Sequence, residues 1–362
     1  MSERIFNFSA GPAVLPEPVL ETIQRDLPAL PGLGMSILEI SHRSAYVDRL
    51  MAETEERLRQ LLNLSADWQV LFLQGGASLQ FTMLAMNFLN ADRPAAYADS
   101  GAWAQKAQEA AAQLGPVLTA WSGQSEHYTR MPAASELLTS DASYLHLTSN
   151  ETIQGIALQD DLDLNGVPVI CDMSSDLLSR PLQMDRYRMI YAGAQKNLGP
   201  AGVTLVLLHQ ELLTQQQPQL PTMLDYQTFV KSGSRYNTPP VFAIYVLNQV
   251  LGWLMDQGGL EPMHARNRAK AERLYAVIDQ SQGFYAGHAA TAHRSLMNVT
   301  FRLPTPELEK TFLAQAAAQG MDGLKGHRAV GGLRASIYNA FPAEGVEALC
   351  ALMQDFQRQH GH

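Results

Sequence analysis

Cysteine is scarce in this sequence of 362 residues, which contains only Cys171 and Cys350. Two thiols cannot build a disulfide framework, and neither cysteine stands at the CxxC or Cys/His spacing that a zinc site requires. The sequence therefore predicts no metal site. Because so few cysteines are typical of proteins from a reducing compartment, we expect a cytoplasmic protein.

Long apolar runs and an excess of positive charge are also absent. No run reaches the roughly 18 uninterrupted apolar residues of a membrane span, and residues 1–10 lack the apolar core of a signal peptide. The 26 Lys and Arg residues are outnumbered by 35 Asp and Glu, which gives a formal charge of −9. This acidic balance argues against binding to nucleic acid or to an anionic membrane surface.

The sequence does contain enough apolar residues, 46%, for a sizeable core, and its length is typical of about two domains. Helical spacing of apolar residues predicts helices over 46–64 and 78–89. Short apolar runs predict strands at 68–73, 95–98, 144–147, 167–171, 189–192 and 203–208. Strands that alternate with helices are typical of an α/β protein with a mostly parallel central sheet.

The pattern changes after Pro218, where a segment rich in Pro, Gly and Ser predicts a loop through Pro240. The apolar stretch 243–255 predicts a core helix, and from Ser295 the order strand, helix, strand, helix predicts a smaller α/β unit. We place the boundary near Gly258. The expected domains are a large one over 16–258 and a small one formed by 1–15 and 259–362.

Lysine is rare enough that each one can be weighed, because the chain has six lysines against twenty arginines. Lys196 follows the predicted strand 189–192 and precedes the apolar run 203–208, so we expect it to be partly buried. Burial depresses the pKa of an ammonium group and frees the amine as a nucleophile or Schiff-base partner. A structural ion pair at a strand end is the alternative. The other five lysines are expected to be solvated: Lys106, Lys231, Lys270, Lys310 and Lys325.

Asp172 ends the apolar run 167–171, which places a carboxylate at the edge of a parallel sheet where ligands bind. A turn or capping role is the alternative for this residue taken alone. Together, Asp172 and Lys196 match what pyridoxal phosphate requires, namely a lysine for the covalent link and a carboxylate that keeps the pyridine nitrogen protonated. We therefore expect this cofactor between the two strand ends.

Two further elements fit the same cofactor. Gly75-Gly-Ala-Ser78 precedes a predicted helix, so its backbone amides and hydroxyl could bind the cofactor phosphate. Trp103 could stack on the pyridine ring. Glycine turns more often only connect elements, and a lone tryptophan more often packs in a core, so these features carry weight only in combination.

An anionic substrate needs guanidinium or imidazole donors. The candidates are the pair His42 and Arg43, the pair His327 and Arg328, and Arg334. One arginine for a carboxylate and a His/Arg group for a phosphate would be chemically sensible. For each candidate taken singly, a surface salt bridge is the more common explanation.

The order and spacing of nine motifs between residues 7 and 339 extend this interpretation. The chain resembles the phosphoserine aminotransferases, which belong to class V of the pyridoxal-phosphate-dependent aminotransferases. The matching motifs are Asn7-Phe-Ser-Ala-Gly-Pro-Ala13, Ser41-His-Arg43, Gly75-Gly-Ala-Ser78, Ser149-Asn-Glu-Thr152, Cys171-Asp-Met-Ser-Ser175, Ala192-Gly-Ala-Gln-Lys-Asn197, Tyr236-Asn-Thr-Pro239, Gly326-His-Arg328 and Leu333-Arg-Ala-Ser-Ile-Tyr-Asn339.

The resemblance implies the type I fold of pyridoxal-phosphate enzymes, a homodimer with shared active sites, and a role for each matching residue. Lys196 would form the Schiff base, and Asp172 would pair with the pyridine nitrogen. The cofactor would also contact Ala77, Ser78, Trp103, Thr152, Gln195 and, from the other subunit, Asn237 and Thr238. The substrate would contact Ser9, His42, Arg43, His327, Arg328 and Arg334. Some relatives carry an arginine where this chain has Ser78, so phosphate recognition differs in detail.

The expected reaction is reversible transamination between L-glutamate and 3-phosphohydroxypyruvate, which gives 2-oxoglutarate and O-phospho-L-serine for serine biosynthesis. Some relatives also accept a substrate that is one carbon longer and leads to pyridoxine. The second-ranked alternative is a class V aminotransferase for unphosphorylated substrates, of the alanine:glyoxylate or serine:pyruvate type, which would not need the extra His/Arg groups. A cysteine desulfurase or selenocysteine lyase would need a reactive cysteine on a mobile loop, and a non-catalytic binding module would transfer no amino group.

Overall fold

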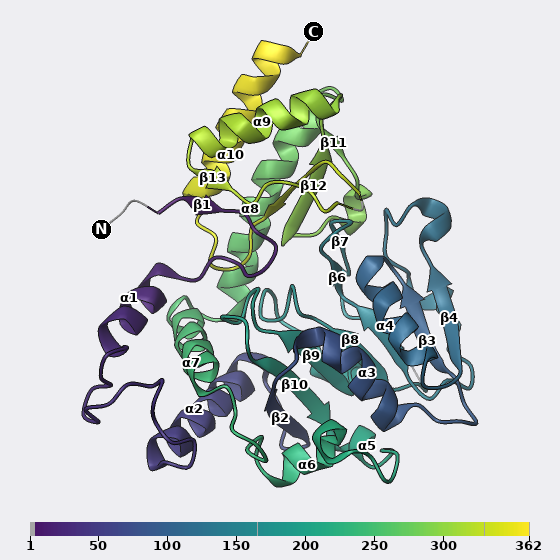
Figure 1. Ribbon diagram of the computed structural model, residues 1–362. Coiled ribbons are helices and arrows are strands. Elements are labelled where there is room, and N and C mark those ends of the chain that lie inside the picture. Colours follow the sequence, from purple (N-terminus) through teal and green to yellow (C-terminus); the bar gives the residue numbers. More distant parts are fainter. Residues whose placement is uncertain (1–3, 165, 329, 362) are drawn as a thin grey trace.

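The computed structural model describes residues 4–164, 166–328 and 330–361. Its lower half in Figure 1 is built on a seven-stranded sheet in the order β2-β10-β9-β8-β5-β3-β4. Strand β10 pairs antiparallel with both neighbours, whereas the other pairings in this sheet are parallel. The strands are β2 (Trp68–Leu73), β3 (Ala95–Asp99), β4 (Val117–Ser122), β5 (Leu145–Thr148), β8 (Val169–Asp172), β9 (Met189–Gly193) and β10 (Thr204–His209). The α/β fold with a mostly parallel sheet is therefore confirmed.

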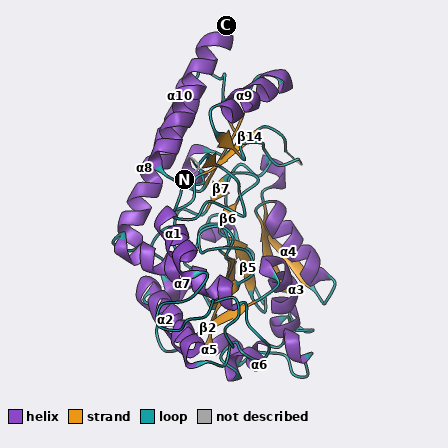
Figure 2. Ribbon diagram, turned by 60° about the vertical axis from the view of Figure 1, so that its left-hand side comes forward, coloured by secondary structure: helices purple, strands orange, loops and turns teal. Residues whose placement is uncertain are grey.

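Helices cover both faces of this sheet, because successive side chains of each strand point to opposite sides. In β9, Ile190 and Ala192 join one hydrophobic cluster, whereas Met189 and Tyr191 join another. Figure 2 shows the resulting layers, with α1, α2 and α7 on one side of the strands and α3 and α4 on the other. The helices of this half are α1 (Glu17–Asp26), α2 (Ala45–Leu62), α3 (Gly76–Phe88), α4 (Ala102–Ala112), α5 (Gln210–Leu213), α6 (Tyr226–Lys231) and α7 (Val241–Asp256).

A separate hydrophobic core lies in the upper half of Figure 1 and joins Phe8 to apolar residues between 271 and 356. It contains a three-stranded sheet, β11-β12-β14, and the two-stranded pair of β1 and β13. The strand–helix–strand–helix order expected after Ser295 is present. The elements are β1 (Phe6–Asn7), α8 (Leu260–Gln280), β11 (Ala286–Gly287), β12 (Asn298–Arg302), α9 (Pro306–Ala318), β13 (Met321–Asp322), β14 (Leu333–Ser336) and α10 (Ala343–His360).

Short elements connect these parts. Strands β6 (Asn150–Glu151) and β7 (Ile156–Ala157) pair with each other beyond the end of β5. The short 3-10 helices are η1 (Gln124–Glu126), η2 (Ala134–Glu136), η3 (Met184–Arg186), η4 (Thr222–Leu224) and η5 (Thr291–His293). Within the described ranges, no helix is long and apolar enough to span a membrane, and no cluster of His, Cys, Asp and Glu could hold a metal ion.

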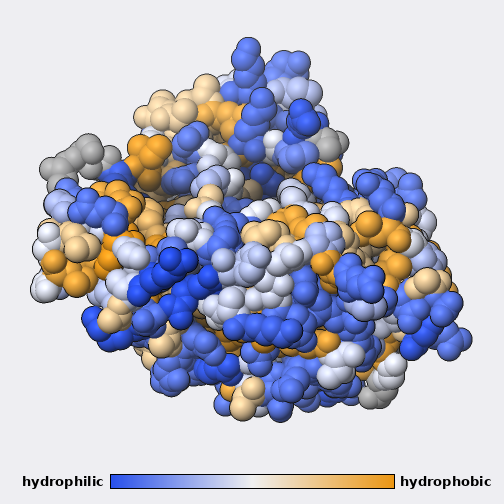
Figure 3. Space-filling model, turned by 60° about the horizontal axis from the view of Figure 1, so that its bottom comes forward, coloured by the Kyte–Doolittle hydropathy of each residue, from blue (hydrophilic) through white to orange (hydrophobic). Residues whose placement is uncertain are grey.

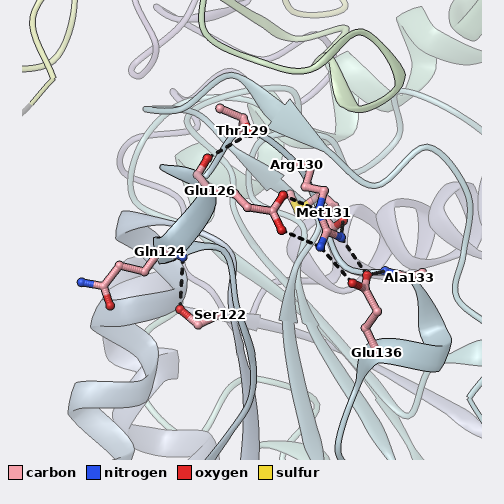
Figure 4. A network of polar contacts seen from close by, with 8 residues as sticks. All are labelled: Ser122, Gln124, Glu126, Thr129, Arg130, Met131, Ala133 and Glu136. Atoms are coloured by element: carbon pink, nitrogen blue, oxygen red, sulfur yellow. Dashed lines mark hydrogen bonds and ion pairs between the residues drawn. The ribbon is translucent and has the colours of Figure 1, made fainter.

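Arg130 organises the segment that connects β4 to β5. Its guanidinium donates to Glu126 at 2.6 Å and to Glu136 at 2.7 Å, so that both short helices η1 and η2 are tied to one side chain (Figure 4). The bond from Arg130, together with one from the Ala133 amide, lowers the pKa of Glu136 to about 2. The same segment contacts the upper half of the molecule, because the amide of Ala290 donates to the carbonyl of Thr129 at 2.8 Å.

Three sequence expectations need correction. Strand β4 was missed because only one of its six residues is buried, so it lacks a clear apolar run. Helix α6 lies inside the expected loop 218–240, where Asp225 accepts a bond from the Gln227 amide at 2.7 Å and so begins the helix. Lys270 was expected to be solvated but is buried in α8.

The buried ammonium group of Lys270 donates its hydrogen bonds to backbone carbonyls and not to water. It donates to the carbonyls of Ile337, Tyr338 and Phe341 at 3.0, 2.6 and 3.1 Å. Burial lowers the pKa of Lys270 to about 7. Lys270 lies between Ala269 and Ala271 in a stretch of α8, residues 266–273, that is otherwise polar. This context gave no sign of burial, since sequence spacing alone does not say which partner covers each helix face. The other lysines that were expected to be solvated, Lys106, Lys231, Lys310 and Lys325, are exposed.

Candidate active site

The C-terminal ends of the parallel strands bring the predicted cofactor residues to one edge of the sheet. Asp172 is the last residue of β8 and pairs in register with Tyr191 of β9. Lys196 follows three residues after β9 ends at Gly193. Thr152 comes shortly after β5, which neighbours β8 on its other side. Such an edge is where ligands of α/β sheets bind.

Asp172 is a buried carboxylate that is well held but lacks an adjacent cation. Its Oδ1 accepts bonds from the Ser174 amide at 2.9 Å and the Ser174 hydroxyl at 2.6 Å. Burial raises the pKa of Asp172 even though these bonds and the charge of Lys196 lower it. Among the described residues, Asp172 has no ion-pair partner within 4.0 Å. A protonated pyridine nitrogen would supply the missing positive charge, so this residue fits the cofactor.

Lys196 lies close to Trp103, with its Nζ 5.6 Å from the centre of the indole ring. Burial lowers the pKa of Lys196, as the sequence predicted, whereas the carboxylates of Asp172 and Glu151 act in the opposite direction. The amine therefore sits in an environment that favours its neutral, nucleophilic form. This group fits the covalent link that pyridoxal phosphate requires.

Trp103 is the second residue of α4 and is fixed by hydrogen bonds that it donates to two consecutive residues of another segment. Its Nε1–H donates to the Thr152 hydroxyl at 2.9 Å, and its backbone amide donates to Glu151 at 3.1 Å. The Lys106 ammonium lies 4.3 Å from the indole centre. Glu151 and Lys106 are not among the site residues predicted from the sequence, although Glu151 lies inside the motif Ser149-Asn-Glu-Thr152.

The start of α3 fits a phosphate. Gly75 and Gly76 have φ angles of 94° and 66°, which glycine adopts readily and other residues rarely do. Gly75 is the N-cap and provides no side-chain hydrogen bond to the helix. The first-turn amides of Ala77 and Ser78 therefore remain suited to an anion. Within the same chain, Asn237 lies near this turn because its amide donates to Gln74 at 3.0 Å. Thr238 is exposed next to Asn237.

An N-terminal segment covers the lysine. The amide of Ala13 donates to the carbonyl of Gln195 at 2.8 Å. A Cβ atom on Gly11 would lie 3.4 Å from Cγ of Lys196, so this position allows close approach of the two segments. Ser9 packs against Gly323, where a Cβ atom would lie 2.6 Å from the Ser9 hydroxyl. The motif that begins at Asn7 is thereby placed beside Lys196.

Arg334 supplies a guanidinium on the side of the small sheet. It is part of β14, and its Nη1 donates to the carbonyl of Thr152 at 3.1 Å. Its Nε is buried without a hydrogen-bond partner among the described residues, which fits a group that awaits a substrate carboxylate. A cavity of about 130 Å³ adjoins it, and His327 and Gln154 contribute to the lining. Burial lowers the pKa of His327, and the positive charges of Arg334, Lys106 and Arg328 lower it further.

His42 and Arg43 do not join this cluster within the chain. They precede α2 in the loop that follows α1, on the left of Figure 1, whereas α4 with Trp103 lies on the right. Arg43 is exposed, and its amide donates to the Ser41 hydroxyl at 3.2 Å. In the described part of the chain, no hydrogen bond or ion pair connects either residue to Lys196 or Arg334.

Both cysteines lie away from solvent. Cys171 belongs to β8 and Cys350 to α10, and both are buried. Burial raises the pKa of the Cys350 thiol to about 11 and that of the Cys171 thiol well above its ordinary value. A reactive cysteine needs a lowered pKa and an accessible position, so neither residue is suited to desulfurase chemistry.

Comparison with known proteins agrees with this geometry. The family description Aminotransferase class-V matches residues 5–349. The phosphoserine aminotransferase of Herpetosiphon aurantiacus is 50% identical over 358 residues, which is 99% of both chains, and that of Lysinibacillus sphaericus is 49% identical over 99% of this chain and 100% of its own.

Solved structures extend the comparison to three dimensions. Phosphoserine aminotransferase from Bacillus circulans subsp. alkalophilus superposes with a TM-score of 0.97 at 49% identity, covering 99% of this chain and 100% of its own. The pyridoxal-phosphate-bound enzyme from Trichomonas vaginalis gives 0.92 at 37% identity, covering 97% and 100%. The chain therefore belongs to the phosphoserine aminotransferase family of the class V, pyridoxal-phosphate-dependent aminotransferases.

Proposed function

We propose that the protein catalyses reversible amino transfer from L-glutamate to 3-phosphohydroxypyruvate, giving 2-oxoglutarate and O-phospho-L-serine. The observation that carries this proposal is the convergence of Lys196, Asp172 and Trp103 at one sheet edge, with the arginine of β14 beside them. The relatives named above, at about half identical residues over the whole chain, support the same reaction. The proposed pathway is serine biosynthesis.

The cofactor residues would act as follows. Bound pyridoxal phosphate withdraws electrons from the substrate α-carbon and so makes its proton removable. Lys196 would link to the cofactor. Its Nζ, once released by the amino donor, would take the α-proton of the donor and deliver it to the cofactor carbon that bears the transferred nitrogen. Asp172 would keep the pyridine nitrogen charged. Trp103 and Thr152 would orient the ring, and the amides of the first turn of α3 would bind its phosphate with Ser78 and Gln195.

Different residues would bind the two anionic groups of the substrate, its carboxylate and its phosphate. The guanidinium of Arg334 would form a bidentate contact with the α-carboxylate, in which the Nε that has no partner among the described residues is one donor. His327 and Arg328 would face the substrate phosphate, or the side-chain carboxylate when glutamate is bound. Ser9 would contribute from the segment that covers Lys196. We also propose activity on the substrate that is one carbon longer and leads to pyridoxine.

We propose a cytoplasmic homodimer in which each active site draws on both subunits. His42 and Arg43 have no described contact with the cluster of their own chain, so their substrate role would be exercised across the dimer. Asn237 and Thr238 would contact the cofactor of the other subunit, with Asn237 held by its bond to Gln74 of its own chain. The loop before α2 exposes Met35 and Leu38, at 40% and 64%. Figure 3 shows an apolar area on the left side, where Figure 1 places α1 and this loop. Such a patch is typical of an interface.

The division into domains also remains a proposal. The hydrophobic clusters on the two faces of the seven-stranded sheet and the separate core of the upper half support a large domain over 16–258 and a small one over 1–15 and 259–362. Subunit sharing can be tested by mixing Lys196→Ala protein with Arg43→Ala protein. If sites are shared, mixed dimers regain activity because one of their two sites carries neither change. No recovery after verified exchange of subunits would contradict sharing across the dimer by Arg43.

A competition experiment tests the substrate. Purified protein loaded with pyridoxal phosphate receives glutamate together with equal concentrations of 3-phosphohydroxypyruvate and hydroxypyruvate. We expect O-phosphoserine to exceed serine by at least about 100-fold, since losing a charged group that the site pairs removes a contact of several kcal/mol. A preference for the unphosphorylated acid would favour the alanine:glyoxylate or serine:pyruvate type instead.

A further inference from the structure

Glu151 is a fully buried carboxylate to which the mechanism above gives no task. It is the last residue of β6 and has 0% exposure. Its Oε2 accepts a bond from the Trp103 amide at 3.1 Å, and its Oε1 accepts one from the Ala104 amide at 2.9 Å. The Ser100 hydroxyl lies 3.5 Å from the same Oε1. A buried carboxylate with three donors is held in one place.

These bonds cap α4 from a distant part of the chain. The N-cap of α4 is Gly101, which has no side chain to accept the free amides of the first turn. Glu151 takes over that task, and its negative charge also suits the positive end of the helix dipole. The absence of a side chain at Gly101 is required for this contact, because a Cβ atom there would lie 2.8 Å from Cδ of Glu151 and 2.9 Å from its Cγ.

Two consecutive residues thereby hold Trp103 at two points. Glu151 fixes the backbone at Trp103, and Thr152 accepts the indole Nε1–H at 2.9 Å. A tryptophan fixed at both ends presents its ring in one orientation, toward the Nζ of Lys196. We propose that Glu151 is a positioning residue, which acts through α4 and Trp103 to preform the surface on which the cofactor ring stacks. This inference rests on the proposed cofactor site but not on the identity of the substrate.

The charge environment agrees with such a role. Burial raises the pKa of Glu151 to about 7, while the two backbone bonds and the charge of Lys196 act to lower it. The negative charge of Asp172 raises the pKa of Glu151 further, and Tyr128 also interacts electrostatically with this carboxylate. Burying a carboxylate is costly, so its presence here needs the compensation that the α4 amides provide.

The first test uses the cofactor-free protein and needs no activity. Glu151→Gln keeps one acceptor but turns the other into an NH₂ group, and Gly101→Ala pushes an unaltered Glu151 away by steric contact. We expect amide hydrogen exchange at Trp103 and Ala104 to accelerate at least about tenfold in both variants. The control is Glu109→Gln, an exposed position on the same helix. Unchanged exchange in both Glu151→Gln and Gly101→Ala would overturn the proposal.

The second test asks whether Glu151 acts through Trp103. The dissociation constant for pyridoxal phosphate is measured for Glu151→Gln, Trp103→Ala and the double variant. We expect Glu151→Gln alone to weaken binding by about 10-fold, in the range typical of residues that orient ligand groups, and to have little further effect once Trp103 is absent. Equal losses in both backgrounds would show that Glu151 acts by another route and would overturn the proposal. Failure of phosphoserine turnover with both results intact would count only against the proposed substrate.

Discussion

Lys196 and Trp103 approach each other across the C-terminal edge of the sheet, with Nζ 5.6 Å from the indole centre. They come from segments that are far apart in the sequence. Lys196 follows β9, whereas Trp103 lies in the first turn of α4, which follows β3. Strand order explains the meeting: β3, β5, β8 and β9 are consecutive neighbours in the sheet and run parallel. The strands between them, β5 and β8, therefore also end at this edge, where Asp172 is the last residue of β8 and Thr152 lies shortly after β5.

Replacement of Asp172 by Asn should impair catalysis without unfolding the protein. Asn keeps the size of the side chain and an oxygen that can accept the bonds of Ser174, but it removes the charge that would pair with the pyridine nitrogen. We expect kcat to fall by about 10²–10³-fold, with melting temperature nearly unchanged. The control is Asp160→Asn at an exposed position. Retention of wild-type kcat by Asp172→Asn would contradict this role.

Replacement of Arg334 by Lys should weaken substrate binding. Lysine keeps the charge but lacks the planar fork and the Nε that is unpartnered in the described structure. We expect KM for glutamate to rise at least about 10-fold and kcat/KM to fall about 100-fold, measured by steady-state kinetics. Arg358→Lys in α10, whose side chain is 73% exposed, should change neither value. Wild-type values of KM and kcat/KM in Arg334→Lys would contradict the proposed role of Arg334 in binding the substrate carboxylate.

Lys270 should matter for stability. Methionine in its place would leave the carbonyls of Ile337, Tyr338 and Phe341 without their shared donor in a buried turn. The same turn donates the Asn339 amide to Asn197, the neighbour of Lys196. We expect Lys270→Met to lower the free energy of unfolding by about 2–4 kcal/mol, measured by urea titration of the cofactor-free protein. Exposed Lys310→Met is the control, and equal stability of both variants would show that these bonds contribute little.

The raised pKa of Glu151 predicts that the free energy of unfolding depends on pH. Its folded pKa of about 7 exceeds the ordinary value of 4.5, so between these values the folded protein binds the proton more tightly than the unfolded chain. Stability contributed by this proton is present below pH 4.5 and is lost as pH rises toward 7. The loss is on the order of 3 kcal/mol. Asp172 and Asp176 change in the same direction, so the comparison must be with a variant.

Glu151→Gln cannot titrate and should therefore remove this part of the slope. The free energy of unfolding of cofactor-free wild type and variant is measured from pH 5 to pH 8. We expect the free energy of unfolding of the variant minus that of wild type to become more positive by a few kcal/mol as pH rises through this range. A constant difference between the two proteins would show that Glu151 does not change its protonation state there.

The sequence predicted most strands and the site residues at their ends. It predicted few contacts between residues that are distant in the sequence. Runs such as 68–73 and 189–192 carry their own apolar signal, and the carboxylate that ends β8 and the amine that follows β9 could be placed at a shared edge from topology alone. Strand β4 could not, because most of its side chains are not buried. Lys270 was misjudged because its three carbonyl partners lie 67 to 71 residues away.

The role of Glu151 could not be predicted from the sequence for a different reason. Its motif was recognised, but its contact with α4 depends on Gly101, which lies 50 positions earlier and has no side chain to indicate the contact. Similarly, spacing could not show that His42 and Arg43 stand apart from Arg334 within one chain, since that separation follows from the placement of the loop before α2. Motifs identified the residues, whereas their arrangement required coordinates.

The most direct test of the account is a half-reaction with the protein loaded with pyridoxal phosphate. O-phospho-L-serine is added without any keto acid, and the visible absorption of the bound cofactor is followed. We predict that this band disappears at low concentrations of O-phosphoserine, that serine has little effect at the same concentrations, and that Lys196→Ala protein shows no such conversion whereas Lys231→Ala protein behaves as wild type. A band in wild type that serine converts as readily as O-phosphoserine, or full conversion by Lys196→Ala, would contradict the account.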